Sequence, residues 1–250
     1  MTRFFAAAAL ALTFAGPLAA QDQPTMTDAE RQAFRAEVRA YLLENPEVLM
    51  EAIAVLEQRQ AAAAVSADTT FVQANADALF NDGYSWVGGN PDGDLTIVEF
   101  MDYRCGYCRR AFEEVNALLN ADGNIRFIVK EFPILGDQSV LSAQFAIAVK
   151  DLHGDEAYHG VHDALMTMAS DVTPDTLARL AETFGLDVAP VFERMQSPEV
   201  AAIITRNREL GQRMQITGTP TFVFGGQMVR GYVPLDQMKL IVEQVRADNG

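Results

Sequence analysis

Two cysteines separated by two residues follow directly after an apolar run, and this arrangement limits the folds open to the chain. The run Leu95–Met101, LTIVEFM, predicts a buried strand, and apolar positions recur at helical spacing after Cys105. A second apolar run, 125–132, begins after a helix end at 122–123. The sequence therefore predicts a strand, a helix and a second strand, with Cys105 and Cys108 at the start of the helix.

The remainder of the chain after this unit divides into a helical stretch and a second strand-containing unit. Residues 137–215 have helical periodicity, with caps at Ser139, Thr173 and Ser197 and no convincing strand. The runs PTFVFGG and QMVRGYV then predict two short strands, which a closing helix over 235–245 follows. We therefore expect a βαβ half and a ββα half separated by an inserted helical domain.

Two amphipathic helices are predicted ahead of the cysteines. Thr27 is a candidate N-cap with Glu30 completing a capping box, and Asn45 with Pro46 marks a second helix start. A third short helix is predicted over 71–80, before a turn-rich stretch that indicates a domain boundary. Such helices must bury their apolar stripe, either on the rest of the chain or against copies of themselves.

The first twenty residues predict export. Arg3 precedes an apolar stretch over 4–12, and small residues end the segment at Ala19 and Ala20, a pattern typical of a signal peptide cleaved near Ala20. The formal charge of −15 disfavours nucleic acid and anionic membranes as partners. Two cysteines so close in sequence would stabilise an exported fold very little, because the loop that they close is short.

The position of the cysteine pair indicates redox chemistry. Cys105 precedes the helix, where unpaired backbone N–H groups and the helix dipole stabilise a thiolate and lower its pKa. Cys108 lies one turn further along, where its sulfur can reach Cys105 and is harder for another protein to attack. We therefore expect Cys105 to be the nucleophile and Cys108 the resolving thiol.

Metal binding is the competing interpretation of the pair. A structural zinc site needs two more ligands, and no histidine repeats a metal-ligand spacing with the cysteines. His162 is expected to be a packed or surface histidine of a helix. A reduced CxxC also suits Cu(I), with methionines such as Met166 and Met168 as further ligands. We predict no metal site and keep copper binding as an alternative.

Several motifs in a fixed order resemble one family. The strand IVEF, the motif CGYC, the segment FIVKEFPILG, the helical insertion and GTPTFVFGG are similar to the DsbA-like periplasmic thiol-disulfide oxidoreductases of the thioredoxin superfamily. The resemblance implies an α/β thioredoxin fold with an inserted all-helical domain, preceded by an N-terminal helical extension. The expected divisions are a signal peptide over 1–20, a helical oligomerisation segment over 21–83, a catalytic domain over 84–136 and 216–250, and the insertion over 137–215.

The resemblance also implies roles for individual residues. A cis-proline loop faces the cysteines in this family, and Thr219-Pro220 matches it, so the Thr219 backbone is expected to pair with a substrate strand. Glu99 matches a buried acid beneath the resolving cysteine that handles its proton, with Lys130 as an expected partner. Gly106-Tyr107 is similar to the dipeptide of DsbC-type isomerases and is expected at the substrate face.

The N-terminal helices resemble the extension of the ScsC or Com1 branch, some of whose members assemble as trimers. We therefore expect a periplasmic homo-oligomer that isomerises disulfides in unfolded or misoxidised exported proteins, with a DsbB- or DsbD-like membrane redox partner and no cofactor beyond the Cys105–Cys108 disulfide. A DsbA-like oxidase, a Cu(I)-binding copper-tolerance protein and a reductant for one client protein remain the alternatives.

Overall fold

The computed structural model describes residues 26–249, and the predicted signal peptide over 1–20 lies outside them. The chain divides into two compact units between Gln58 and Arg59. The elements are α1 (Asp28–Glu44), α2 (Glu47–Ala74), α3 (Ala76–Phe80), β1 (Trp86–Gly89), β2 (Leu95–Met101), α4 (Gly106–Asp122), β3 (Ile125–Glu131), α5 (Asp137–Thr167), α6 (Pro174–Thr183), α7 (Val188–Met195), α8 (Pro198–Arg213), β4 (Thr221–Phe224), β5 (Gln227–Arg230) and α9 (Leu235–Asn249). Within 26–249, no helix combines the length and apolar character needed to cross a membrane.

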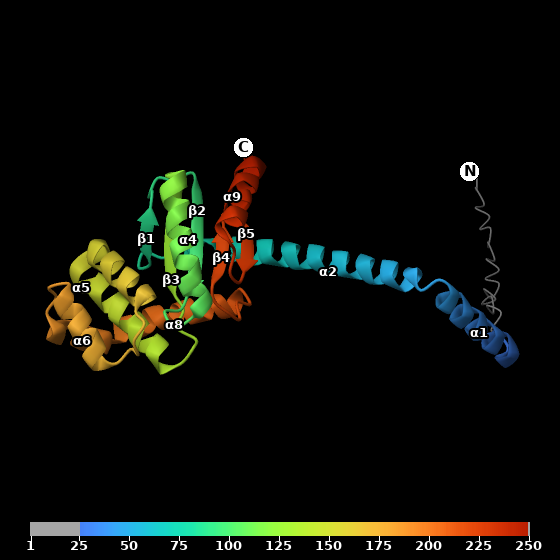
Figure 1. Cartoon of the computed structure of the whole chain (residues 1–250), viewed down its shortest axis with the longest axis horizontal. Helices are drawn as coiled ribbons and strands as arrows, with labels where there is room; N and C mark the ends of the chain where they lie inside the picture. Colours follow the sequence, from blue (N-terminus) through green and yellow to red (C-terminus); the bar gives the residue numbers. More distant parts are fainter. Residues whose placement is uncertain (1–25, 250) are drawn as a thin grey trace, which may run out of the picture. The chain divides into compact units, whose positions relative to one another are not determined.

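One mixed sheet organises the larger unit, residues 59–250. Its strand order is β1-β3-β2-β4-β5, with β2 and β3 parallel and the other pairs antiparallel (Figure 1). Side chains alternate between the two faces of a strand, so each face has its own core. α4 and α9 cover the face that carries Ile97 and Met101, whereas α3, α8 and the end of α2 cover the face that carries Val98 and Phe100.

The inserted helices follow β3 and return the chain to β4. α5 bends at Gly154, whose φ of 84° is the left-handed conformation that glycine adopts without a Cβ penalty. The caps expected at Thr173 and Ser197 are present and accept from the backbone of Thr176 and Val200, whereas the cap expected at Ser139 is wrong, because Gly136 is the N-cap of α5. Core residues of α5 to α8 form one cluster with those of α4 and the sheet. The predicted thioredoxin fold with an inserted helical domain is therefore confirmed.

The boundary between the units lies earlier than the expected 83/84 division. Val72 and Leu79 are buried against Val98 of the sheet, so the end of α2 and all of α3 belong to the larger unit. The stretch expected to be turn-rich also contains β1, which pairs with β3. Strand propensity does not predict β1, because two of its four residues are glycines, which are depleted in strands.

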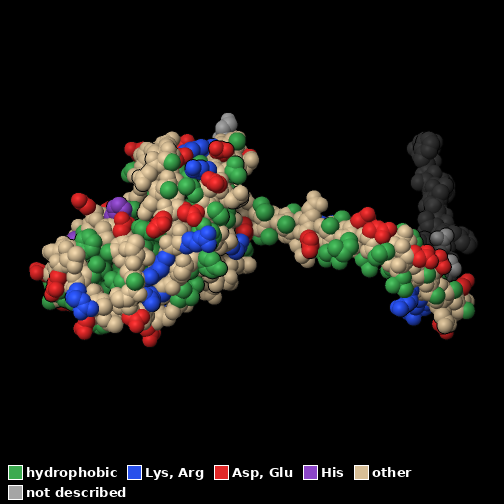
Figure 2. Space-filling view, in the orientation of Figure 1, with side chains coloured by type: hydrophobic (Ala, Val, Ile, Leu, Met, Phe, Trp, Pro, Cys, Tyr) green, Lys and Arg blue, Asp and Glu red, His purple; other side chains and the backbone are tan. Residues whose placement is uncertain are grey.

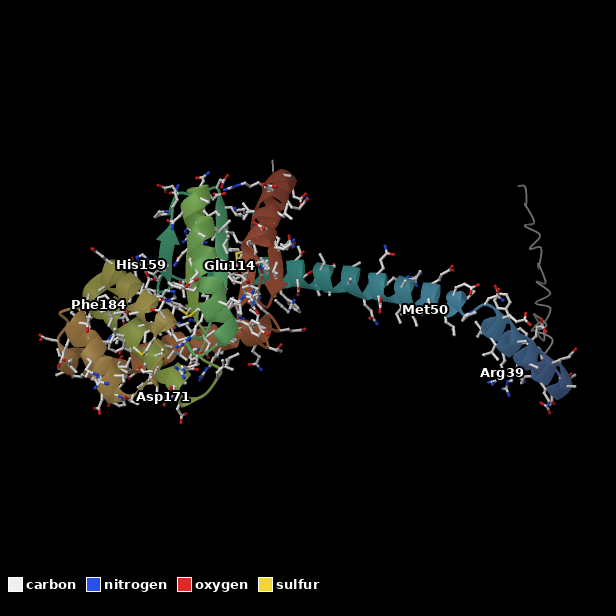
Figure 3. All side chains as sticks on the ribbon, in the orientation of Figure 1. Arg39, Met50, Glu114, His159, Asp171 and Phe184 are labelled. Carbon is white, nitrogen blue, oxygen red and sulfur yellow. The ribbon has the colours of Figure 1, made fainter. Side chains whose placement is uncertain are left out.

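The smaller unit, residues 1–58, shows α1 and the beginning of α2. The predicted capping box is present: the Glu30 backbone donates to Thr27 Oγ1 at 3.3 Å, and the Thr27 backbone donates to Glu30 Oε2 at 2.8 Å. No residue of α1 is buried, and Leu43 and Met50 are about two-thirds exposed, at 69% and 66%. Figure 3 labels Met50 on α2 and Arg39 on α1. Figure 2 shows apolar side chains interleaved with charged ones along α1 and α2. The apolar stripe of α1 therefore has no cover within this chain's smaller unit.

Candidate active site

Cys105 is the N-cap residue of α4, as the sequence predicted. It follows β2 after a short turn, in which its backbone N–H donates to the Asp102 carbonyl at 3.0 Å. Its thiol donates to the Thr219 carbonyl oxygen, and the Cys108 thiol and the backbone of Tyr107 and Cys108 favour its ionised form. Both cysteines are free thiols in this structure. The first turn of α4 therefore surrounds one sulfur with hydrogen-bond donors.

These donors separate the pKa values of the two thiols. The hydrogen bond from Cys108, helped by the Thr219 side chain and the two backbone N–H groups, lowers the pKa of Cys105 to about 5 although partial burial opposes it. Cys108 is fully buried, and burial raises the pKa of its thiol far above the ordinary range. At neutral pH the arrangement thus holds one thiolate nucleophile and one protonated thiol.

The Thr219-Pro220 peptide bond is cis, and this loop faces Cys105. The Cys105 thiol lies 3.2 Å from the Thr219 carbonyl oxygen. The loop is held from behind, because the Gly231 backbone donates to the Pro220 carbonyl at 2.8 Å and the Thr221 hydroxyl donates to the Gly218 carbonyl at 2.9 Å. The structure therefore brings the cysteines together with the loop that the family resemblance predicted to face them.

The exposed surface around Cys105 is aromatic and cationic. Gly106 is exposed, and Tyr107 is 63% exposed with its ring centroid 6.3 Å from that of Tyr232. The guanidinium of Arg110 lies 4.4 Å from the centre of the Tyr232 ring. Glu114 fixes this ring by accepting from its hydroxyl. Sequence analysis did not identify Tyr232, which lies far along the chain in a loop with no motif of its own.

Glu99 lies on β2, on the sheet face that α4 covers. Its side chain is 4% exposed, and Oε1 has no hydrogen-bond partner among the described residues. Burial raises the pKa of Glu99 to about 8, and the negative charge on Cys105 adds to the rise. Its charge in turn raises the pKa of Cys108, so the two groups are electrostatically coupled. A carboxyl in this position can take a proton near neutral pH.

Lys130 is not the partner of Glu99, and that prediction is wrong. Parallel pairing sets Glu99 against Val129, so Lys130 points to the opposite face of the sheet. There its Nζ lies 2.5 Å from Asp82 Oδ2 and donates to the Ala78 carbonyl at 2.8 Å. The pair is buried and anchors the segment after α3 to the sheet, away from the thiols.

Two polar residues, neither of which was predicted to have a structural role, hold the turn before Cys105. The carboxylate of Asp102 accepts from the backbone of Arg104 at 2.8 Å and of Ile134 at 2.8 Å, which ties this turn to the chain after β3. Arg109 donates to the Tyr103 carbonyl at 2.7 Å and to the Met168 carbonyl at 2.7 Å. These contacts join the start of α4 to the inserted helices.

A buried network also links the turn to the insertion. Glu131 Oε1 accepts from the hydroxyls of Tyr103 and Tyr158 at 2.7 and 2.6 Å, and the Tyr103 hydroxyl lies 3.0 Å from Nδ1 of His162. Burial raises the pKa of Glu131 to about 8 and lowers the pKa of His162 to about 3. His162 is thus a neutral, packed histidine, as predicted. Within residues 26–249, no three His, Cys, Asp or Glu side chains gather so as to hold a metal ion.

Comparison with known proteins agrees with this geometry. Residues 96–243 match the model of the DSBA-like thioredoxin domain family, and residues 30–63 match the Copper resistance protein ScsC N-terminal domain. The first match covers more than half of the chain and includes both cysteines. The second covers most of α1 and the following part of α2.

Solved structures resemble the chain either over about two-thirds of its length or over most of it. A thioredoxin-like oxidoreductase from Silicibacter pomeroyi is 40% identical, covers 69% of this chain and 98% of its own, and has a TM-score of 0.65. BcfH of Salmonella enterica Typhimurium is 27% identical over 86% of this chain and 95% of its own, with a TM-score of 0.73. A linker-deletion mutant of Proteus mirabilis ScsC is 25% identical over 89% and 98%, with a TM-score of 0.67.

Curated relatives match a smaller part of the chain, and at lower identity, than the Silicibacter pomeroyi structure. The chain spans about a quarter of the length of a Na(+)/H(+) antiporter NhaA 1 of Salinispora arenicola, to which it is 27% identical over 157 residues, 62% of this chain. The similarity to ScsC and BcfH structures extends beyond the cysteine domain into the N-terminal helices. With the fold and CxxC site of a disulfide oxidoreductase, the chain belongs to the DSBA-like thioredoxin domain family, in its ScsC-like branch.

Proposed function

We propose that the protein is a periplasmic thiol-disulfide oxidoreductase that isomerises disulfides in exported proteins. The observation that carries the proposal is Cys105, a thiol with a pKa of about 5 at the start of α4, whose sulfur lies 3.2 Å from the Thr219 carbonyl of the cis-proline loop. The leader-like pattern over residues 1–20 supports export. Misoxidised exported proteins are then the clients.

In the first step the Cys105 thiolate attacks one sulfur of a client disulfide. A Cys105–client bond forms, the client disulfide breaks, and the second client sulfur leaves as a thiolate with the electron pair. The Thr219 backbone positions the client strand, with Gly106 and Tyr107 at the surrounding surface. The nucleophile is already ionised at neutral pH, so this step needs no base.

Two routes then release the client. Another client thiolate can attack the mixed disulfide, which re-forms a client disulfide, returns the Cys105 thiolate and completes isomerisation without net redox change. Alternatively, Cys108 attacks Cys105, becomes oxidised and leaves the client reduced. In the second route the Cys108 proton passes to the ionised carboxylate of Glu99, which the mixed disulfide favours because Cys105 no longer carries the negative charge that raises the pKa of Glu99. A DsbD-like membrane partner would restore the dithiol, and a DsbB-like partner would serve an oxidase instead.

The N-terminal helices are proposed to assemble copies of the chain. In the smaller unit a groove of about 400 Å³ is lined mostly by apolar residues of α1 and the start of α2, among them Phe34, Val38 and Leu49. None of the large apolar side chains of α1 is buried. A second copy would cover this groove and bring several Cys105 sites to one client, which favours reshuffling.

Recovery of active ribonuclease from its scrambled, fully oxidised form tests the proposal. The dithiol form of the mature protein should restore activity, Cys105→Ala should not, and a form lacking residues 21–66 should be slower. Oxidation of reduced ribonuclease without reshuffling would replace the isomerase with a DsbA-like oxidase. Inactivity on both substrates, together with tight Cu(I) binding, would replace it with a copper-binding protein.

A further inference from the structure

One exposed arginine beside the active site contacts no carboxylate. The segment around the cysteines carries Arg104, Arg109 and Arg110. Arg104 lies 3.6 Å from the carboxylate of Asp171 and donates to the Ser170 carbonyl at 3.3 Å, and Arg109 donates to backbone carbonyls. Within residues 26–249, the exposed Arg110 lies at ion-pair distance from no acidic side chain. Two of the three arginines therefore have structural contacts, whereas the third can take a further acceptor.

The ring of Tyr232 holds this third guanidinium in place. The Arg110 guanidinium carbon lies 4.4 Å from the centre of the ring, a distance typical of a cation–π interaction. Glu114 fixes the ring, because one of its oxygens accepts from the Tyr232 hydroxyl and the other from the Leu235 backbone at 2.5 Å. Both oxygens of Glu114 are thus occupied, although this residue lies one turn from Arg110. A guanidinium carries its N–H donors in its own plane, so stacking on a ring leaves its edge available.

Tyr232 is connected to both parts of the site that are proposed to hold a client. It directly follows Gly231, whose backbone donates to the carbonyl of Pro220 in the cis-proline loop at 2.8 Å. The centroid of its ring lies 6.3 Å from that of Tyr107, which lies between the two cysteines. Residues three apart share one face of a helix, so Tyr107 and Arg110 project from the same face of α4. The guanidinium therefore lies next to the surface that surrounds the reacting sulfur.

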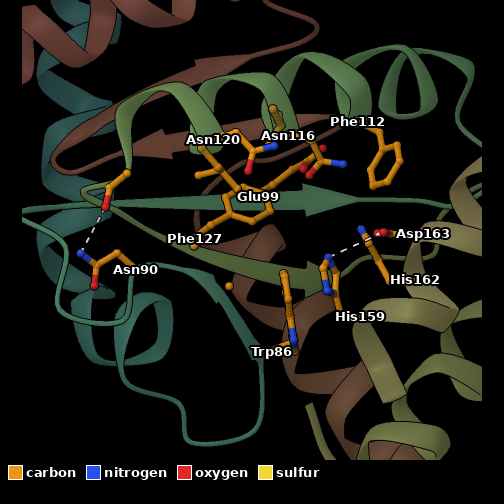
Figure 4. A pocket seen from close by; sticks show the side chains of 15 residues that line it. Trp86, Asn90, Glu99, Phe112, Asn116, Asn120, Phe127, His159, His162 and Asp163 are labelled. Carbon is orange, nitrogen blue, oxygen red and sulfur yellow. Dashed lines mark hydrogen bonds and ion pairs between the residues drawn. The ribbon is translucent and has the colours of Figure 1, made fainter. Parts of the chain in front are cut away.

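The opposite face of α4 is a separate surface. Figure 4 shows Phe112, Asn116 and Asn120 of this helix beside a pocket that Trp86 also lines. Successive residues of a helix are rotated by about 100°, which places these three side chains on the far side of α4 from Arg110. A substitution at Arg110 therefore changes the face beside the cis-proline loop and leaves the pocket intact.

We propose that Arg110, held by Tyr232, binds an Asp or Glu side chain of the client that lies two or three residues from the reacting cysteine. The inference rests on the proposed function, in which a client strand pairs with the Thr219 backbone. Arg110 is five residues from Cys105, a rise of about 7.5 Å along the helix. Two or three residues of extended strand cover this distance at ~3.3 Å each. The planar fork of arginine can then donate two parallel hydrogen bonds to the carboxylate.

This local preference opposes the charge of the whole protein. The formal charge of −15 repels acidic segments at long range. Contact with Arg110 offsets this repulsion only for a carboxylate that reaches the guanidinium. We therefore expect a preference that depends on where the acidic residue stands relative to the cysteine, and not on the net charge of the client.

Peptides with a single activated cysteine measure this preference in the Cys108→Ala variant, where the reaction stops at the mixed disulfide. Each peptide carries its cysteine as an uncharged 2-pyridyl disulfide. The Cys105 thiolate attacks the peptide sulfur, a Cys105–peptide disulfide forms, and the pyridyl sulfur leaves with the electron pair and takes a proton from water. Release of the coloured pyridine-2-thione gives the rate. The peptides carry Glu or Gln at one position, which is two or three residues before or after the cysteine, or six residues away.

The rate for the Glu peptide divided by the rate for the Gln peptide should be about three- to fivefold higher with Arg110 present than in Arg110→Gln, at two or three residues from the cysteine. Comparing the two ratios cancels any general change in the reactivity of Cys105 or of the peptide. At six residues the two ratios should agree. Arg104→Gln removes the same charge from the residue next to Cys105 and is the matched control, which should retain the preference.

Two substitutions at Tyr232 test whether the ring positions the guanidinium. Tyr232→Phe keeps the ring and should retain most of the preference, whereas Tyr232→Leu should lose most of it. Equal ratios with and without Arg110 at every position would overturn the proposal, as would an equal loss in Arg104→Gln, which would show an effect of charge alone. If no peptide releases pyridine-2-thione through Cys105, the proposed function itself fails.

Discussion

Glu99 and Lys130 lie on adjacent parallel strands but point to opposite faces of the sheet. The register places Glu99 beside Val129, so the lysine shares a face with Phe100 and reaches Asp82 instead. Among the described residues no cation shifts the pKa of Glu99, which is set by burial and by the charge on Cys105. The lysine has a separate, structural task on the other face.

Lys130→Met should destabilise the fold by about 3 kcal/mol, at the lower end of the ~3–5 kcal/mol typical of a broken buried ion pair. The lower end is expected because Asp82 keeps hydrogen bonds from Ser85 and from the Tyr84 backbone. Chemical denaturation measures the loss. Adding Asp82→Asn should recover part of it, and a double variant as unstable as Lys130→Met would contradict the ion-pair account.

Cys105 should react with iodoacetamide as a thiolate. Its pKa of about 5 lies well below that of an ordinary thiol, so the alkylation rate should rise through pH 5 and stay flat from about pH 6 to 8. Absorbance at 240 nm gives the same midpoint independently. Cys108 should stay unmodified in the folded protein because it is fully buried. A midpoint near 8.5 would show that the groups around Cys105 do not lower the pKa of its thiol.

Glu99→Gln should stabilise the protein at high pH. The folded pKa of about 8 lies above the unfolded value near 4.5, so the folded form holds the proton more tightly and loses relative stability as pH rises toward 8. The melting temperatures of wild type and Glu99→Gln should therefore converge below about pH 4.5, and the variant should exceed wild type above pH 8. Equal melting temperatures of wild type and Glu99→Gln at pH 9 would show that Glu99 is not buried in its charged form.

The local signals in the sequence predicted much of this site. Three short motifs each predicted a local structure that is present. They are CGYC after an apolar strand, Gly-Thr-Pro before the next strand, and the capping box of Thr27 with Glu30. The Glu99 partner depended on strand register and face, which no short motif specifies. Glu131 and Tyr232 were missed for a related reason, because their roles arise from tertiary contacts with distant residues.

Removal of residues 21–66 should lower the oligomer order and leave the catalytic unit folded, because the chain first becomes buried in the sheet's core at Val72. Light scattering of the mature protein and the shortened form measures the change. Val38→Lys places a charge in the apolar groove and should have the same effect, whereas Gln32→Lys on the same helix should not. A mature protein that is already monomeric would contradict the assembly.

Trapping of mixed disulfides tests the central claim, that Cys105 attacks and Cys108 resolves. Wild type, Cys105→Ala and Cys108→Ala are mixed with scrambled ribonuclease, quenched with acid and separated on non-reducing gels. The account predicts a disulfide-linked complex that accumulates in Cys108→Ala, is transient in wild type and is absent in Cys105→Ala. A complex that forms through Cys108 in Cys105→Ala, or no complex in Cys108→Ala, would contradict it.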